Sequence, residues 1–180
     1  TLRGKENFNI TGISMSVEPY FVKALGYVKK ACAMANRDLG CFDKRIAYAI
    51  IAACDRLIAG ELRDQFITDF IQGGAGTSVN MNANEVIANV ALESLGHQKG
   101  DYHIVSPNDH VNFGQSTNDV YPVAFRLALI LRLASYIGWF TAVFGFLFAL
   151  VTILRKLLNP EMQAGWASTL AVMLVLGGVI

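Results

Sequence analysis

The spacing of apolar residues in the first third of the chain predicts two helices. Apolar side chains recur every three to four positions from Glu18 to Leu39 and again from Asp43 to Gly60. Pro19 suits the first turn of a helix, and Asp43 suits an N-cap. The pattern therefore predicts a hairpin of two amphipathic helices.

Further along, polar and glycine-rich stretches separate two more predicted helices. The run QGGAGT (72–77) breaks the periodicity, and a helix is predicted from about Asn82 to Leu95. After a polar connection, another helix is predicted to begin at Gln115–Asn118, with Pro122 inside its first turn. This last helix becomes progressively apolar, and its start offers several N-cap candidates.

From Ala134 to Leu154 the pattern changes to an uninterrupted apolar run without a charge. Its length is close to the roughly 20 residues that a helix needs to cross a bilayer. A turn at Asn159 and Pro160 then leads to a second, shorter apolar run that reaches Ile180. These features predict a transmembrane-type helical hairpin, with membrane contact through residues 134–154 and 166–180.

Charge divides the chain at the same place. Of the 15 Lys and Arg residues, 13 lie in residues 1–132, as do 13 of the 14 Asp and Glu residues. We therefore expect two regions, 1–132 and 133–180. No basic patch indicates a nucleic-acid partner. The three cysteines and three histidines follow no ligand spacing, so no metal site is expected.

Two polar clusters, GTSVN (76–80) and QSTND (115–119), precede predicted helices. A helix N-terminus offers unpaired N–H groups and a partial positive charge, and hydroxyl and amide side chains add neutral donors. Such a site suits a carboxylate. The alternative is structural: residues 116–118 are caps and residues 77–80 form a turn.

Longer motifs favour the ligand interpretation. The segments QGGAGTSVNMNANEVIAN (72–89), PNDHVN (107–112) and QSTNDVYP (115–122) closely resemble the aspartate ammonia-lyase family. The resemblance extends upstream through TLRGKENFNITG (1–12) and ANRDLG (35–40), so it covers about 130 residues. It implies a mostly α chain: an incomplete aspartase/fumarase-type N-terminal helical region that runs into the transmembrane-type hairpin.

The resemblance also implies a reaction, the anti elimination of ammonia from L-aspartate to give fumarate without a cofactor. The small dicarboxylate would bind to a set of hydroxyl and amide side chains: Thr77, Ser116, Thr117 and Asn118. A further set would shape the loop or lie at the periphery of the site: Ser78, Asn80, Asn82, Asn108, Asp109 and His110.

No catalytic residue is assigned. The family's base is a serine on a mobile glycine-serine-serine loop, which corresponds to no segment of this sequence. Relatives form homotetramers in which three subunits build each site, an assembly that is doubtful here. We therefore expect this chain to be inactive alone.

The tail resembles another family. Residues 131–158, followed by GWAS (165–168) and LGGVI (176–180), are similar to the C-terminal membrane hairpin of bactoprenol-phosphate glucosyltransferases. That resemblance implies a cytoplasmic lyase portion with a membrane-associated tail. Three functional hypotheses follow: a lyase, a membrane-anchoring module, and a composite chain without activity.

Overall fold

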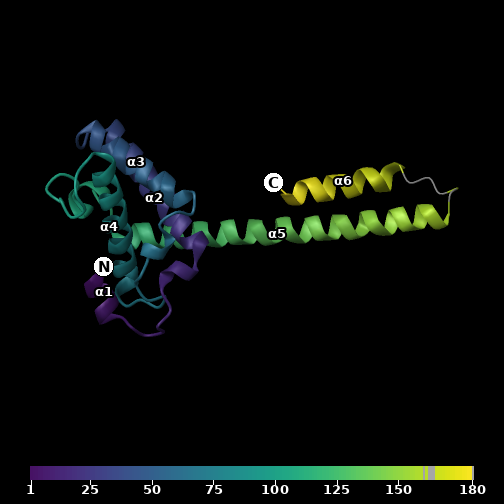
Figure 1. Cartoon of the computed structure of the whole chain (residues 1–180), viewed down its shortest axis with the longest axis horizontal. Helices are drawn as coiled ribbons and strands as arrows, with labels where there is room; N and C mark the ends of the chain where they lie inside the picture. Colours follow the sequence, from purple (N-terminus) through teal and green to yellow (C-terminus); the bar gives the residue numbers. More distant parts are fainter. Residues whose placement is uncertain (160, 162–164, 180) are drawn as a thin grey trace. The chain divides into compact units, whose positions relative to one another are not determined.

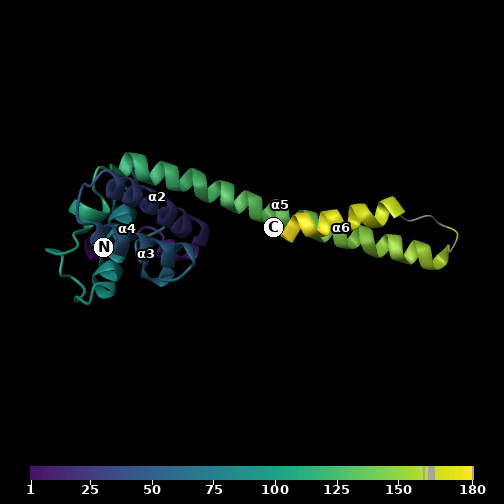
Figure 2. The ribbon, with the colours of Figure 1, turned by 90° about the horizontal axis from the view of Figure 1, so that it is seen from above.

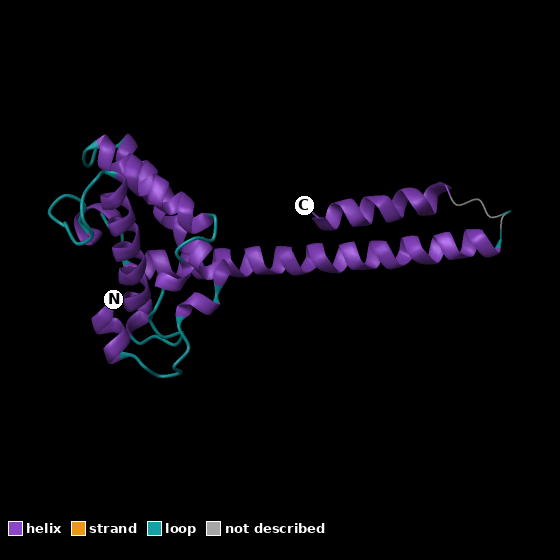
Figure 3. Cartoon of the chain, viewed as in Figure 1, coloured by secondary structure: helices purple, strands orange, loops and turns teal. Residues whose placement is uncertain are grey.

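A computed structural model describes residues 1–159, 161 and 165–179, and within them no β-strand forms. The chain divides into two compact units, Thr1–Leu129 and Ile130–Ile180. Figures 1 and 3 show the elements, which are α1 (Leu2–Asn7), η1 (Met15–Val17), α2 (Pro19–Asp38), α3 (Lys44–Ile58), η2 (Arg63–Gln65), η3 (Gly74–Gly76), α4 (Thr77–Ser94), η4 (Pro107–Val111), α5 (Thr117–Leu158) and α6 (Gly165–Val179). The predicted mostly α fold is confirmed.

Helices α2 and α3 form as the apolar pattern predicts. Pro19 occupies the first turn of α2, and the Asp43 side chain caps α3 by accepting the Arg45 backbone N–H at 2.7 Å. The helices approach closely at Gly26, where an added Cβ would lie 3.0 Å from Ile58 Cγ1. Their inner faces join α4 in one apolar core, and the view in Figure 2 shows these three helices clustered together.

Helix α4 begins earlier than predicted, at Thr77 rather than about Asn82. The left-handed residues Gly74, Ala75 and Gly76 (φ 60°, 55° and 83°) turn the chain, and the helix starts directly afterwards. The early turns contain buried asparagines, which the apolar periodicity does not register. The polar cluster at 77–80 is therefore the first turn of the helix rather than a segment before it.

Helix α5 begins at Thr117, within the predicted range. Pro122 is its sixth residue, so the prediction that it lies inside the first turn was wrong. Proline has no N–H to donate to the carbonyl four residues earlier, which is that of Asn118. The helix is continuous to Leu158, and the boundary between the two units falls inside it.

The Asp69 carboxylate ties the N-terminal segment to the loop before η3. It accepts the backbone N–H groups of Ile10, Thr11 and Gly12 at 2.8–3.0 Å, and that of Ile71 at 2.8 Å. Burial alone raises the pKa of this carboxyl, but the hydrogen bonds from Ile71, Thr11 and Gly12 outweigh it and lower the pKa to about 2.

This lowered pKa predicts an acid-dependent loss of stability. A carboxyl whose pKa is lower in the folded state stabilises the fold above its unfolded pKa of about 3.9, and this contribution disappears as the pH falls towards 2. Asp69→Asn should therefore lower the melting temperature at pH 5 and flatten its decline below pH 4. Circular dichroism measures both, with exposed Asp64→Asn as the control. An unchanged decline in Asp69→Asn would contradict the assignment.

In the second unit, residues 130–158 of α5 pack against α6 through small residues. An added Cβ at Gly178 would lie 2.4 Å from the Gly138 carbonyl oxygen, and one at Gly145 would lie 2.7 Å from Leu174 Cβ. The predicted turn at Pro160 and the terminal Ile180 lie outside the described residues.

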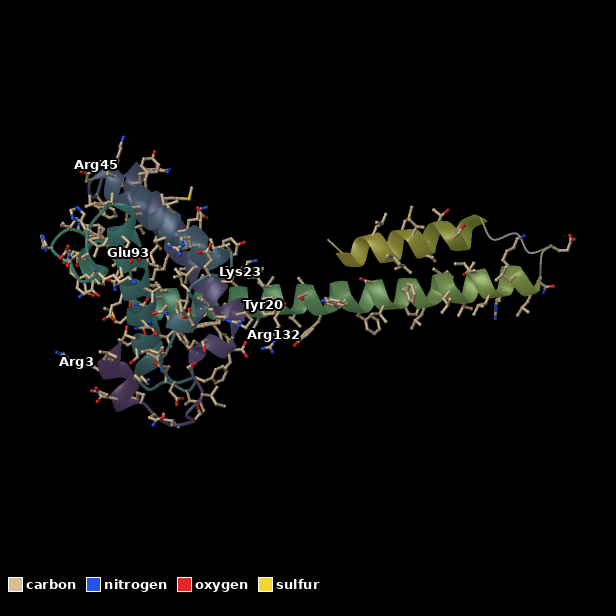
Figure 4. The ribbon with its side chains drawn as sticks, in the orientation of Figure 1. Arg3, Tyr20, Lys23, Arg45, Glu93 and Arg132 are labelled. Carbon is tan, nitrogen blue, oxygen red and sulfur yellow. The ribbon has the colours of Figure 1, made fainter. Side chains whose placement is uncertain are left out.

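The outer surface of the second unit is apolar. Phe140, Phe146 and Trp139 have exposed fractions of 74%, 63% and 70%. In Figure 4 the side chains along this part of α5 are mostly carbon, whereas nitrogen and oxygen are dense in the first unit. Among the described residues α5 is long and apolar enough to cross a membrane, with a mean hydropathy of 2.2 over its most apolar stretch, while the apolar part of α6 (Ser168–Gly178) is shorter.

Candidate functional site

The starts of α4 and α5 lie side by side in the first unit. Gly76, immediately before α4, is buried against the Tyr121 ring, and an added Cβ would lie 2.1 Å from Tyr121 Cδ2. The Tyr121 ring also packs edge-on against the Phe21 ring, with 5.2 Å between the ring centroids. We call residues 76–80 and 115–118 the paired helix starts.

A hydrogen bond from Asn80 joins the paired helix starts. Asn80 Nδ2 donates to Thr117 Oγ1 at 3.2 Å and to Asn112 Oδ1 at 3.1 Å. Since the Thr117 hydroxyl accepts this bond, its own hydrogen remains available to a ligand. Asn80 is buried, so this bond holds the half-buried Thr117 side chain in one orientation.

Ser116 is exposed and caps α5. Its hydroxyl oxygen accepts the Asn118 backbone N–H at 3.2 Å, and its carbonyl accepts the N–H groups of Asp119 and Val120. Ser116 therefore caps α5, as the structural alternative predicts. The hydroxyl keeps a hydrogen to donate, so capping and ligand binding are compatible. Asn118 is exposed beside it.

Thr77 is exposed on the first turn of α4 and bonds locally. Both its hydroxyl, at 2.8 Å, and its backbone N–H donate to the Gly74 carbonyl. The helix has no side-chain N-cap bond, so the first-turn N–H groups that follow Thr77 have no partner within the helix.

Ser78 and Asn82 fix the surroundings of this turn. Ser78 lies against α1, because an added Cβ at Gly4 would be 2.8 Å from Ser78 Cβ. Asn82 is fully buried and ties α4 to the preceding loop: it accepts the Ile67 N–H at 3.1 Å and donates to the Gln65 carbonyl at 2.9 Å.

The PNDHV turn, η4, is held by local bonds. The Ser106 hydroxyl accepts the N–H groups of exposed Asn108 and Asp109 and donates to Asp109 Oδ2 at 2.8 Å. His110 Nδ1 accepts the Ser106 N–H at 2.8 Å, and the imidazole packs edge-on against Phe42. Burial lowers the pKa of His110, partly offset by Asp109. No hydrogen bond described in the structure joins residues 108–110 to Thr77 or residues 116–118.

A buried polar cluster, which the sequence pattern did not predict, lies beneath the paired helix starts. Lys29 is fully buried, and its ammonium donates at 2.9 Å to both Asn112 Oδ1 and Gln115 Oε1. Asn84, also buried, donates to Asn112 Oδ1 at 3.1 Å. The sequence does contain one signal: Lys29 follows Leu25 by four residues and so lies on the apolar stripe of α2.

The electrostatics of this region favour an anion. Lys29 provides one buried positive charge, and the other polar groups of the cluster are neutral amides and hydroxyls. Burial lowers the Lys29 pKa to about 8, while the nearby thiols of Cys32 and Cys54 raise it in part. Within the described part of the chain, no group of three or more His, Cys, Asp or Glu residues is placed to hold a metal ion.

Comparisons with known proteins match the same part of the chain. The model of a family described as "Lyase" matches residues 1–138. Aspartate ammonia-lyase of Helicobacter pylori (strain J99) is 56% identical over 138 residues, which are 77% of this chain and 30% of the relative. That of Escherichia coli (strain K12) is 57% identical over 130 residues, 72% of this chain and 27% of the relative.

Solved structures agree with this match. A fumarate lyase:delta crystallin from Brucella melitensis superposes with a TM-score of 0.72 at 50% identity, covering 82% of this chain and 35% of that one. A class II fumarase from Schistosoma mansoni gives 0.69 at 30% identity, covering 86% and 32%. This chain thus spans about a third or less of the length of these proteins. By sequence and by fold, the chain belongs to the lyase family, within the fumarase/aspartase superfamily.

Proposed function

We propose that residues 1–132 are the N-terminal region of an aspartate ammonia-lyase, in which the paired helix starts bind the carboxylates of L-aspartate and fumarate. The observation that carries this proposal is the Asn80–Thr117 hydrogen bond, which joins the two helix starts and leaves the Thr117 hydrogen free. The similarity to aspartate ammonia-lyases supports the choice of substrate.

In this proposal the chain binds and orients the substrate. Thr117, Ser116 and Asn118 donate to one carboxylate at the start of α5, where the helix adds partial positive charge. Thr77 and the first-turn amides of α4 contribute from the other side. When a base removes the proton from the carbon next to a carboxylate, that carboxylate gains negative charge as an aci-carboxylate. Donors fixed beforehand bind this form more strongly than the ground state.

The proton-abstracting base is assigned to none of the 180 residues. His110 is held by the Ser106 N–H and Phe42 and is not joined to the paired helix starts. We place Asn108, Asp109 and His110 at the periphery of the site and give Ser78 and Asn82 a loop-shaping role. No cofactor enters the proposal.

Isothermal titration of the full chain with succinate, in detergent micelles, tests the site. Thr117→Val removes a donor to a charged group while keeping the side-chain shape, and such a bond contributes roughly 1.5 to 3 kcal/mol. We expect an affinity at least about tenfold weaker, and a smaller loss for Ser116→Ala. Thr141→Val is the control, because that hydroxyl bonds only to carbonyls of its own helix. Equal affinities for Thr117→Val and the unmodified chain would contradict the proposal and mean that residues 116–118 serve only as helix caps.

We also propose that residues 133–180 anchor the chain in a membrane, with the lyase region on the cytoplasmic side. The exposed apolar surface of α5 supports this second role. Apolar side chains surround the helix here, so burying one face in a protein core would leave the others in water. The bactoprenol-phosphate glucosyltransferase hairpin is the type of anchor that the tail sequence resembles.

A further inference from the structure

The Lys29 ammonium is a buried charge without an opposite charge. Its two hydrogen-bond acceptors are the amide oxygens of Asn112 and Gln115, and no ion pair with a carboxylate is formed within the described residues. Burying a cation costs free energy, and neutral acceptors offset this cost less well than a carboxylate does. The packing and hydrogen bonds of Lys29 therefore do not explain why a charged side chain occupies this buried position.

Three consecutive hydrogen bonds connect this charge to the paired helix starts. Lys29 Nζ donates to Asn112 Oδ1, Asn80 Nδ2 donates to the same oxygen, and Asn80 Nδ2 also donates to Thr117 Oγ1. A second connection is direct, since Gln115 immediately precedes Ser116. Gln115 Nε2 also donates to the Val111 carbonyl at 2.8 Å, which holds the turn before α5.

We propose that Lys29 is a positioning residue for carboxylate binding: its buried ammonium orders Asn112 and Gln115, and so the start of α5, and attracts the dianion bound there. This inference rests on the proposed function of the paired helix starts. Lys29 does not touch the ligand. It acts through the amides that it holds and through its field, which the protein interior screens less than water does.

The inference predicts that binding depends on the protonation of Lys29. The pKa near 8 means that the ammonium loses its proton within an accessible pH range. The titratable groups that influence it are Cys32 on α2 and Cys54 on α3, and burial raises the pKa of both thiols, that of Cys54 to about 12. The two side chains that accept from the ammonium, Asn112 and Gln115, lie between η4 and α5 and are neutral amides. The α4 side chains that bond to Asn112 are also amides, and Asp119 on the first turn of α5 is exposed.

The sign of this pH dependence follows from the charge of Lys29. Below pH 8 the cation is present and affinity is high, and above pH 8 the neutral amine attracts a dianion less. By linkage, a bound dicarboxylate must raise the Lys29 pKa. The acid dissociation constant of Lys29 falls by the same factor by which protonation raises the affinity for the dicarboxylate. An effect on the order of tenfold, which is reasonable for a buried unit charge near a dianion, corresponds to a shift of about one pH unit.

The test is succinate titration of the full chain in micelles, from about one unit below to one unit above the Lys29 pKa. We expect the affinity of the unmodified chain to fall about fivefold across this range, roughly half of the full effect, because the complex titrates about one pH unit higher. Lys29→Met, which keeps the length without the charge, should bind about as weakly as the unmodified chain at high pH and with no pH dependence. Lys30→Met is the matched control, since the neighbouring Lys30 forms an exposed ion pair with Asp55.

A purely structural role for Lys29 would weaken binding in Lys29→Met but leave a flat profile in the unmodified chain, and that result overturns the inference. So does a Lys29→Met profile that matches the Lys30→Met profile. If Thr117→Val still weakens binding in either case, the proposed function stands without this inference. If the unmodified chain binds no succinate, both fail.

A second measurement covers the case in which Lys29→Met does not fold. The ¹³Cε resonances of labelled lysines in the unmodified chain report each lysine's titration. One resonance should titrate near pH 8 and move to a higher pKa when succinate is added. A resonance near pH 8 that succinate does not move, or the absence of such a resonance, contradicts the inference.

Discussion

Phe146→Arg is expected to weaken membrane partitioning of the full chain by roughly 2.5 to 3.5 kcal/mol, the cost of placing an arginine at the centre of a membrane-spanning helix. Phe146 lies near the middle of the uncharged run 134–154, and 63% of it is exposed. A burial-driven soluble fold would instead accept a charge at such an exposed position. Co-sedimentation with lipid vesicles measures the change.

Phe125→Arg is the matched control for this substitution. Phe125 is on the same helix and 49% exposed, but it lies in the first unit, outside the uncharged run. It should leave partitioning unchanged within error. If Phe146→Arg and Phe125→Arg behave alike, or if the unmodified chain remains monomeric in buffer without detergent, the membrane assignment is wrong.

Gly76→Ala is expected to destabilise the first unit strongly and to abolish succinate binding. The residue has a φ of +83°, and its added Cβ would lie 2.1 Å from the Tyr121 ring. The backbone conformation costs an alanine roughly 1 to 2 kcal/mol, and the overpacking adds typically 1 to 3 kcal/mol. Relief of the clash requires the Tyr121 ring to move, and this disturbs the contact between the starts of α4 and α5 and with it the proposed site.

Gly96→Ala separates these two effects. Gly96 has nearly the same φ, +82°, but no atom lies within 4 Å of an added Cβ. This variant should show the backbone cost alone and retain succinate binding. Denaturant unfolding of both variants gives the difference. Equal destabilisation would mean that the contact between Gly76 and Tyr121 does not join the two helix starts.

Sequence periodicity predicted those helices whose inner faces are apolar. For α2 and α3, the apolar stripe, the N-terminal proline and the Asp43 cap together specify both ends within a residue or two. For α4 the same reasoning placed the start at about Asn82, because the polar cluster 76–80 looks like a segment that precedes the helix. In the structure Asn80, Asn82 and Asn84 are buried, and the side-chain N–H group of each donates to a residue outside α4.

Local sequence could predict only part of the candidate site. Ser116, Thr117 and Asn118 are adjacent at a helix start, so local sequence indicates a group of donors. The proposed contribution of Lys29 depends on contacts with residues more than 80 positions away, which no local pattern reveals. A lysine on an apolar helix stripe is the one feature that could have suggested it.

Amide chemical-shift mapping with succinate tests the central claim most directly. In ¹⁵N-labelled full chain in micelles, we expect saturable shifts with one common Kd for the amides of residues 77–79 and 116–118. These are the first turn of α4, and the cap and first residues of α5. Thr117→Val should weaken both sets together. Shifts confined to residues 107–110, or no saturable shift at the starts of α4 and α5, would contradict the claim that these two helix starts form one dicarboxylate site.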